Sequence, residues 1–428
     1  MKTFVIFELM NQMVLVARAA KARGLRLVVL NQDPLRDSGD FAVPDGLVDE
    51  LITVRSWTDA DAVTALVDDV LRHHEVAGTY AGFEPTLPFE AALREKAGLP
   101  HNTVADTVFA LDKGLVRAKL YAESLSALRS TSLREALTWA HWRFDRPAIL
   151  KPANGTGSAL CFAVSDLDQL REAAAAVAAH TVINPLMREY IAAHGGFVLE
   201  ERADGELLSV ESLADRGTVH HIGLTGRYVL AANPVVEQGL FFPYEHPRRA
   251  DIIVAAQRFH RSLNIVHGPT HLEVMVPARG PVELIDFNLR FAGLGANVLI
   301  NTAYGKRFEE LLVDVGCGVR PDVAALGQPH RFAADMLVMP PPGVLELTGF
   351  TFPPQAETRR LMKRIGQRLT GRSDQLDAVA MFTVSGDTAP DTHATAEWAR
   401  NRALVNGEPV ADHPALRVVF GARAGAAA

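Results

Sequence analysis

The chain contains 428 residues, of which 48% are hydrophobic and 22% are charged, a composition typical of folded globular proteins that excludes general disorder. This length favours three or four compact units over a single core. The net charge of -7 provides no basic footprint, so we do not expect a nucleic acid partner, and any phosphate-bearing ligand requires local positive charge.

The first 105 residues alternate between strand and helix patterns. Strands are expected at 3–8, 25–33 and 77–84, and amphipathic helices at 13–24, 57–74 and 85–100. In the second helix, Thr58 and Asp61 have the spacing of a capping box. The alternation predicts a small parallel sheet of the doubly wound type. Because the first strand-to-helix turn lacks Gly-x-Gly-x-x-Gly, a dinucleotide site there has weak support.

Two features bear on the compartment. Glu8 interrupts the apolar run of the first twenty residues, which therefore predicts a strand and a helix and not a signal peptide or a membrane span. The two cysteines of the sequence, Cys161 and Cys317, favour a reducing compartment without a disulfide framework. We therefore expect a cytoplasmic protein.

An expected strand, "AIL", leads directly into the glycine-rich loop "KPANGTGSA". Gly155 and Gly157 allow backbone N–H groups to approach phosphate oxygens, and Lys151 supplies a positive charge at the end of the strand. It is not a Walker loop, because no Gly-Lys-Ser/Thr follows. The alternative is a β-hairpin turn with a surface lysine. Lys113, in "DKGLVRAKL", is on its own best explained as a solvated helix residue.

The segment "LEERADGELLSVES" combines two expected strands with a short polar connector. The first strand ends in Glu200 and Glu201. A connector whose backbone groups lack strand partners suits the edge of an adenine, which needs one donor and one acceptor. An exposed, charged hairpin is the alternative.

The strands "THLEVMV" and "VELIDFN" are joined by a turn and should form an antiparallel hairpin. Asp286, Asn288 and Arg290 occupy alternate positions and therefore point to one face. If Glu273 lies opposite or diagonal to Asp286, two carboxylates and an amide oxygen share that face, which suits Mg²⁺ completed by substrate phosphates. A one-residue slip would send Glu273 to the other face. The alternative is a structural ion pair between Asp286 and Arg290 beside a hydrogen-bonded asparagine.

In this order, these four pieces resemble the ATP-grasp superfamily. "GFEPTLPFEAALREKAGLP", "HGPTHLEV" and "IDFNLRFAG" are similar to segments of its L-amino acid ligases, which form dipeptides, and of related carboxylate–amine ligases. The resemblance implies an α/β fold with four parts. These are a Rossmann-like N-terminal domain with a parallel sheet (1–105), a lid subdomain with linker helices (106–205), a large subdomain with the Mg²⁺ and substrate site (206–330), and a small C-terminal α+β domain (331–428). The two central α+β subdomains would clasp ATP.

The resemblance also implies a set of site residues. The expected ATP contacts are Lys113, Lys151, Asn154, Gly155, Thr156, Gly157, Ser158, Glu200, Glu201, Arg202, Ala203 and Glu206. The expected Mg²⁺ ligands are Glu273, Asp286 and Asn288. Lys151 and Arg290 would act in catalysis by neutralising the transferred phosphate. The expected substrate contacts are Glu84, Glu237, His271, Arg290 and Gly293.

Some positions depart from the family's pattern. Asp286 stands where glutamate is usual, and Leu289 where proline is usual; aspartate can still ligate a metal, at shorter reach. Leu207 occupies the place of a ribose-binding glutamate, with Glu206 one position earlier. Leu240 stands where the ligases often have a histidine, so we expect a changed substrate pocket.

The implied function is an ATP-dependent carboxylate–amine ligase. It would join an amino acid or similar carboxylate to an amine or second amino acid through an acyl phosphate, releasing ADP and phosphate. We expect ATP and Mg²⁺, as two ions that Mn²⁺ can replace, small-molecule carboxylate and amine substrates, no nucleic acid or membrane partner, and a homodimer as the default assembly. The alternatives are an ATP-grasp enzyme with another acceptor, such as a carboxylase or a nucleotide-precursor ligase, and an inactive ATP-binding protein. Residues 226–245 lack the basic cluster that bicarbonate or a ribose phosphate requires.

Overall fold

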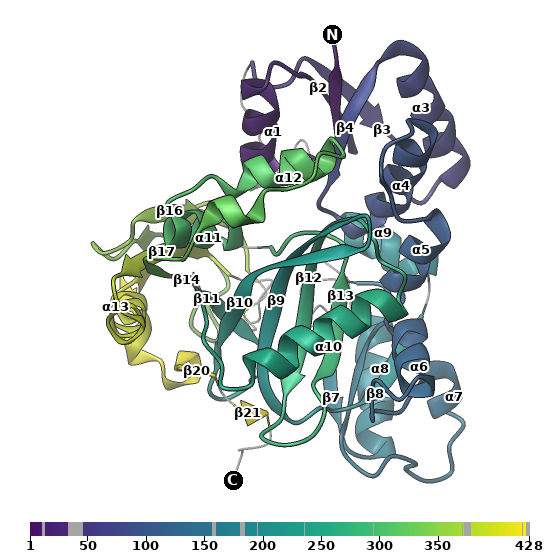
Figure 1. Ribbon diagram of the computed structural model, residues 1–428. Coiled ribbons are helices and arrows are strands. Elements are labelled where there is room, and N and C mark those ends of the chain that lie inside the picture. Colours follow the sequence, from purple (N-terminus) through teal and green to yellow (C-terminus); the bar gives the residue numbers. More distant parts are fainter. Residues whose placement is uncertain are drawn as a thin grey trace.

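The computed structural model describes residues 1–10, 13–32, 46–155, 160–179, 185–194, 196–234, 236–293, 295–369, 371, 378–421 and 423–424. A parallel N-terminal sheet lies at one end of the molecule, and a long antiparallel sheet fills the middle (Figure 1). A smaller lid sheet with its helices lies beside the antiparallel sheet. None of the helices in these ranges combines the length and apolar character that a membrane span needs.

The N-terminal sheet is parallel and has the order β3-β2-β1-β4. Its strands are β1 (Thr3–Phe7), β2 (Arg26–Gln32), β3 (Glu50–Val54) and β4 (Val76–Ala81), and its helices are α1 (Met13–Ala22), α3 (Ala60–His73) and α4 (Leu87–Lys96). Alternate residues of β1 pack on opposite faces. Phe4 and Ile6 contribute to the core shared with α1 and α12 (Phe308–Gly316), whereas Val5 and Phe7 contribute to the core shared with α3. The predicted doubly wound parallel sheet is therefore confirmed.

The start of α3 differs from the prediction. Asp59 is the N-cap, and its side chain accepts a hydrogen bond from Ala62 N at 3.1 Å. Thr58 Oγ1 instead donates to Glu189 Oε1 at 3.0 Å. The capping box with Thr58 and Asp61 is therefore wrong, because a carboxylate one residue later satisfies the free N–H group and Thr58 has a partner distant in sequence.

Linker helices and a small antiparallel sheet follow. The linker elements are η1 (Glu84–Thr86), α5 (Val104–Leu111) and α6 (Lys113–Ala122). The lid sheet has the order β5-β8-β6-β7, from β5 (Ser130–Ser132), β6 (Ala148–Pro152), β7 (Phe162–Val164) and β8 (Phe197–Glu201), with α7 (Leu133–Ala136), α8 (Leu167–Ala179) and α9 (Pro185–His194). The side chain of Asp112 accepts a hydrogen bond from Leu115 N at 2.9 Å, so the cap of α6 places Lys113 at its first position.

The long antiparallel sheet runs β13-β12-β9-β10-β11-β14-β17-β16, with β20 and β21 at the side. Its strands are β9 (Gly205–Asp215), β10 (Thr218–Leu230), β11 (Glu237–Phe242), β12 (Gly268–Val276), β13 (Glu283–Asn288), β14 (Phe332–Val338), β16 (Thr358–Leu361), β17 (Ala380–Gly386), β20 (Val418–Phe420) and β21 (Arg423–Ala424). Along β9, Leu208 and Val210 join the core beneath α10 (Arg249–Ser262), which crosses that face (Figure 1). The alternate residues Ser209 and Glu211 therefore point to the opposite face.

The C-terminal segment continues this sheet. Strand β14 pairs with β11 on one side and with β17 on the other, so the expected boundary near residue 330 falls between neighbouring strands of one sheet. The remaining elements are α11 (Ala296–Tyr304), η2 (Val323–Leu326), β15 (Phe350–Thr351), α13 (Ala389–Asn401), β18 (Leu404–Val405), β19 (Glu408–Pro409), η4 (Val410–Asp412) and η5 (Pro414–Leu416).

Candidate active site

The hairpin of β12 and β13 brings two acidic residues together. Glu273 is the cross-strand partner of Asp286, and His271 is the partner of Asn288. A β-bulge follows, because Val274 pairs with Leu284 and leaves Ile285 as the extra residue. The side chain of Asn288 donates from Nδ2 to His271 O at 3.2 Å, so its Oδ1 remains an acceptor. The register needed for a shared oxygen-rich face is therefore present.

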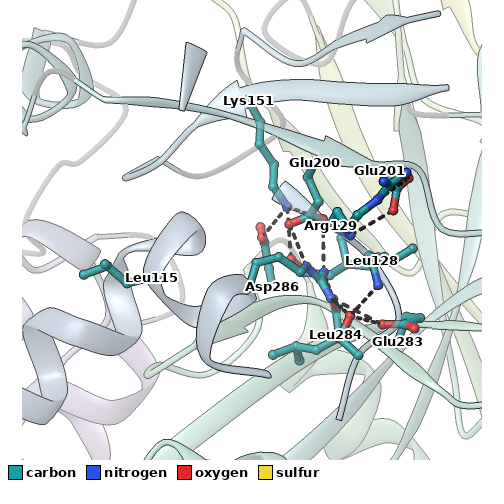
Figure 2. Close-up of polar contacts among 12 residues, drawn as sticks. Leu115, Leu128, Arg129, Lys151, Glu200, Glu201, Glu283, Leu284 and Asp286 are labelled. Atoms are coloured by element: carbon teal, nitrogen blue, oxygen red, sulfur yellow. Dashed lines mark hydrogen bonds and ion pairs between the residues drawn. The ribbon is translucent and has the colours of Figure 1, made fainter. Parts of the chain in front are cut away.

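Two lysines from other elements converge on Asp286. Lys151 Nζ, at the end of β6, lies 3.4 Å from Asp286 Oδ1 and 3.4 Å from Glu200 Oε1. Figure 2 shows Lys151 reaching between these two carboxylates. Lys113 Nζ lies 3.4 Å from Asp286 Oδ2 and donates to Gly155 O at 2.8 Å. A surface lysine is therefore the wrong description of Lys151, which is buried.

The segment containing Glu200 is not an exposed hairpin. Strands β8 and β9 belong to different sheets, and both Glu200 and Glu201 are buried. Arg117 of α6 donates to the two oxygens of Glu200 at 2.9 and 3.0 Å. Burial raises the pKa of Glu200, but Arg117 and Lys151 outweigh this and leave the pKa below its usual value. The exposed, charged hairpin that was the alternative to an adenine-binding segment is therefore wrong.

Arg117 connects the lid sheet to the long sheet. Besides Glu200 on β8, it donates from Nη1 to Glu283 Oε2 at 3.3 Å and from Nη2 to Leu284 O on β13. The Glu283 carboxylate also accepts from Ser126 Oγ at 2.6 Å. Figure 2 shows Glu283 and Leu284 in the lower part of the view, below Asp286. Arg117 is 2% exposed. One guanidinium thus holds both walls of the space that contains Lys151 and Asp286.

An apolar surface follows the charged end of β8. Ala203, in the connector, packs in one cluster with Met275 of β12, and Leu207 and Ile285 pack against them. Glu201 is bound by Arg129, with Oε1 to Nη2 at 2.7 Å. The main chain of Arg202 donates to Pro147 O at 2.8 Å, so the backbone of the connector is fixed on the lid sheet.

Several of these groups, among them Lys113, Arg117, Glu200 and Asp286, line a pocket. Its walls come from the N-terminal domain, the linker helices, the lid and β13, and include Glu84, Leu111, Lys113, Arg117, Gly155, Tyr190, Glu200, Ile285, Asp286 and Asn288. Asn154 is buried beside it and donates to Leu111 O at 3.3 Å. Of the expected glycine-loop contacts, Thr156, Gly157 and Ser158 lie outside the described residues.

Arg290 does not pair with Asp286, so the ion pair proposed as the alternative is wrong. Its guanidinium contacts Glu84 instead, with Nη2 to Oε1 at 2.6 Å and Nε to Oε1 at 2.7 Å. Glu84 is buried, and despite that burial Arg290 keeps the pKa of its carboxyl below the usual value. Gly293 follows on the same loop and borders open space where a side chain would project.

A row of charged side chains extends from Glu273 across strands β12, β9, β10 and β11 of the long sheet. His271 Nδ1 lies 2.9 Å from Glu211 Oε1, and its Nε2 lies 3.3 Å from Glu273 Oε1. Burial lowers the pKa of His271, but the carboxylates of Glu211 and Glu273 outweigh burial and raise this pKa to about 9. Arg227 of β10 follows, with Nε 3.1 Å from Glu237 Oε1 on β11. His271 therefore supports two carboxylates through its ring nitrogens.

Sequence reasoning missed Arg117 and Arg227. Arg117 has the appearance of an ordinary helix residue, and only the fold reveals its partners. For Arg227 a signal existed: it interrupts the otherwise uncharged strand "GLTGRYVL", and a buried charge needs a partner. Glu206, considered for the ribose, accepts from Tyr244 Oη at 2.5 Å and lies 3.7 Å from His246 Nε2.

The donor set fits Mg²⁺. Glu273 and Asp286 offer carboxylate oxygens and Asn288 offers Oδ1, all hard ligands of the kind that Mg²⁺ prefers, with its remaining positions left to phosphates and water. Within the described part of the chain, no group of three or more His, Cys, Asp or Glu side chains could hold a metal by itself. Two carboxylates and an amide therefore suit a metal that is shared with a phosphate-bearing ligand.

Two families of known domains match this chain. The ATP-grasp domain matches residues 144–298, which include Lys151, Glu200 and the hairpin, and the ATP-grasp N-terminal domain matches residues 17–101. The chain belongs to the ATP-grasp family. Together the two matches span more than half of this ATP-grasp protein, and no curated protein sequence matches it.

Solved structures share the ATP-grasp fold along nearly the whole chain. The L-amino acid ligase from Bacillus licheniformis is similar with a TM-score of 0.77 at 18% identity, covering 95% of this chain and 99% of that one. Phosphoribosylglycinamide synthetase from Anaerococcus prevotii gives 0.69 at 12%, covering 95% and 100%. The biotin carboxylase domain of 2-oxoglutarate carboxylase from Hydrogenobacter thermophilus, solved with MgADP, ADP and bicarbonate, gives 0.67 at 14%, covering 98% and 91%. At these identities the likeness establishes the fold of the ATP-grasp chain.

Proposed function

We propose that this protein is a cytoplasmic ATP-dependent carboxylate–amine ligase that forms an amide or peptide bond through an acyl phosphate. The observation that carries the proposal is the convergence of Lys113 and Lys151 on Asp286, opposite Glu273. Cations and carboxylates from the linker, the lid and β13 meet there around one pocket. Such an arrangement suits a phosphate chain and its metal ions.

ATP would lie between the lid sheet and the long sheet. The adenine would rest on the apolar surface of Ala203, Leu207 and Ile285, with its polar edge toward the backbone of Glu201 to Ala203. Lys113, Lys151 and the glycine loop would contact the phosphates. Because Leu207 carries no polar group, Glu206 is the candidate for the ribose, and it would have to exchange its bond with Tyr244.

Glu273, Asp286 and Asn288 would hold Mg²⁺, which supplies charge neutralisation for the phosphates. We propose two ions, for which Mn²⁺ can substitute. The lysines now bound to Asp286 would turn to the phosphates, so the carboxylate remains compensated when ATP arrives. Mutual compensation of this kind limits the cost of keeping charges buried in either state.

The chemistry follows from these charges. An oxygen of the donor carboxylate attacks the γ-phosphorus, the bond to the β-phosphate oxygen breaks, and ADP leaves. Lys151 neutralises the negative charge of the transferred group, and preorganised charge of this type is the main contribution of a protein to phosphoryl transfer. An amine then attacks the acyl carbon, phosphate leaves with the bonding electrons, and the amine nitrogen loses a proton. Water must be excluded, because acyl phosphates hydrolyse.

A screen for product formation tests the proposal. Purified protein is mixed with MgATP and a matrix of amino acids and amines, and ADP, AMP, phosphate and product mass are measured. We expect ADP and phosphate in equal amounts with one amide per turnover. AMP with pyrophosphate would contradict the proposal. Turnover that requires bicarbonate would favour the carboxylase alternative, and stabilisation by MgATP without any turnover would favour an inactive binding protein.

A further inference from the structure

Helix α10 carries a row of exposed residues on its outer face. On its inner side, Ile252, Ala256 and Phe259 are buried against the long sheet. Figure 1 shows the helix crossing this sheet at the front of the view, and on the outer side Val254 is 55% exposed. One exposed valine is ordinary for a protein surface, so the residues around it decide whether this face has a partner.

Exposed residues recur along the outer face at spacings of four, three, four and three positions, which is the spacing of the seam between two packed helices. They are Pro247, Asp251, Val254, Arg258 and Arg261. An acidic, an apolar and a basic residue thus follow one another, with Val254 in the middle. A second α10 that runs antiparallel would place Asp251 opposite Arg258 twice, on either side of a contact between the two Val254 side chains. Such self-complementarity is what a two-fold interface between identical chains requires.

A groove lies along the same face, between α10, the residues after α6 and the turn that joins β12 to β13. Among its lining residues, Leu125, Ala255 and Val282 are apolar and at least half-buried, whereas Asp251 and Arg258 are charged and exposed. An acidic partner would meet the carboxylate of Asp251, and a basic partner would meet the guanidinium of Arg258. A second copy of the chain presents the opposite charge to each of them, so it fits this groove best.

Both charged residues have room for a partner. Asp251 Oδ2 lies 2.9 Å from Arg248 Nε, but the side chain of Asp251 remains 59% exposed. Arg258 is exposed and forms no ion pair within the described ranges. Arg248 also donates to Pro277 O and Gly280 O, both at 2.7 Å, which fixes the turn against α10. The groove is therefore rigid before a partner arrives, and this lowers the entropic cost of association.

We propose that two copies of the chain associate through α10, packed antiparallel about a two-fold axis, with Asp251 of each copy paired to Arg258 of the partner subunit. This interface does not depend on the proposed ligase function. Because α10 covers the face of the long sheet opposite to Glu211, both candidate active sites stay open to substrates. A helix pair with its groove is small beside standard interfaces of about 800 Å² per partner, so the dimer is reversible, with a dissociation constant on the order of 10 µM.

Analytical ultracentrifugation of the full chain tests the proposal. Between about 1 and 200 µM, a range that brackets this constant, the mass of the wild type should rise from one chain to two. Asp251→Arg and Arg258→Asp should each weaken the dimer by at least about 10-fold, because two attractive pairs become repulsive. An equimolar mixture of these two variants regains both attractive pairs, so a heterodimer should form with nearly the affinity of the wild type. The mixture also shows that both variants are folded.

Asp168→Arg is the matched control, because Asp168 lies on α8 of the lid with a side chain that is 89% exposed, and its mass profile should equal that of the wild type. A wild type that stays a single chain at every concentration would overturn the proposal, even if its α10 face binds an acidic peptide. Dimers that persist in either single variant, or variants that stay apart when they are mixed, would overturn it as well.

Discussion

Arg117 provides the sharpest test of how the proposed ATP cleft is held together. In Arg117→Met, Glu200 loses its contacts at 2.9 and 3.0 Å and Glu283 loses one at 3.3 Å. Removing one partner of a buried ion pair costs about 3–5 kcal/mol. Glu200 retains Lys151 at 3.4 Å, and Glu283 retains Ser126 Oγ at 2.6 Å. We therefore expect a loss near the lower limit, about 3 kcal/mol.

The assay is urea unfolding followed by tryptophan fluorescence, to which Trp139 and Trp142 of the lid contribute. Arg129→Met is the matched control: Arg129 also pairs with a glutamate of β8, but its side chain is 36% exposed. The Glu201 carboxylate keeps its backbone N–H donors from residues 129 and 145, so we expect a smaller loss of about 1 kcal/mol. The double variant Arg117→Met with Glu200→Met should recover part of the loss, because it removes the unpaired charge. Equal small losses for both single variants would refute the reasoning.

Other predictions concern the metal and the pH. Asp286→Asn should reduce ADP formation by more than about 100-fold, since even outer partners of metal sites contribute about 10- to 100-fold, and it should abolish the Mg²⁺-dependent part of thermal stabilisation by ADP; full turnover would contradict the role. Burial raises the pKa of Glu8 from 4.5 to about 7 in the folded protein, against bonds from Trp57 and Gln32 that lower it. The folded state therefore keeps this proton longer than the unfolded state, and stability should fall by about 3 kcal/mol as the pH rises from 4.5 through 7. The glutamine of Glu8→Gln cannot ionise. The urea denaturation midpoint of this variant, measured relative to that of the wild type, should therefore increase between pH 5 and pH 8; a constant difference would exclude this account.

The hairpin of the candidate site was predictable because its signal is local. Polar residues at every second position of an apolar strand specify one face, and the turn sets the partner strand, so the sequence alone indicated that Glu273 and Asp286 could meet. This inference depends on side-chain periodicity over a few positions.

The partners of the charged residues could not be predicted in the same way. Arg290 binds Glu84, which is 206 positions away, and Arg117 binds Glu200 and Leu284, which are 83 and 167 positions away. No local pattern encodes such pairs, because they form only when separate sheets pack. The same reason explains why the continuation of the central sheet into β14 and β17 was not evident from the sequence.

Transfer of oxygen from the donor acid to phosphate tests the central claim most directly. A donor identified by the product screen is labelled with ¹⁸O in its carboxylate and incubated with MgATP and an amine, and the released phosphate is analysed by mass spectrometry. An acyl phosphate requires one labelled oxygen in each phosphate, because the bond that breaks on amide formation is the one between carbon and the bridging oxygen. Unlabelled phosphate, or label in AMP, would contradict the account.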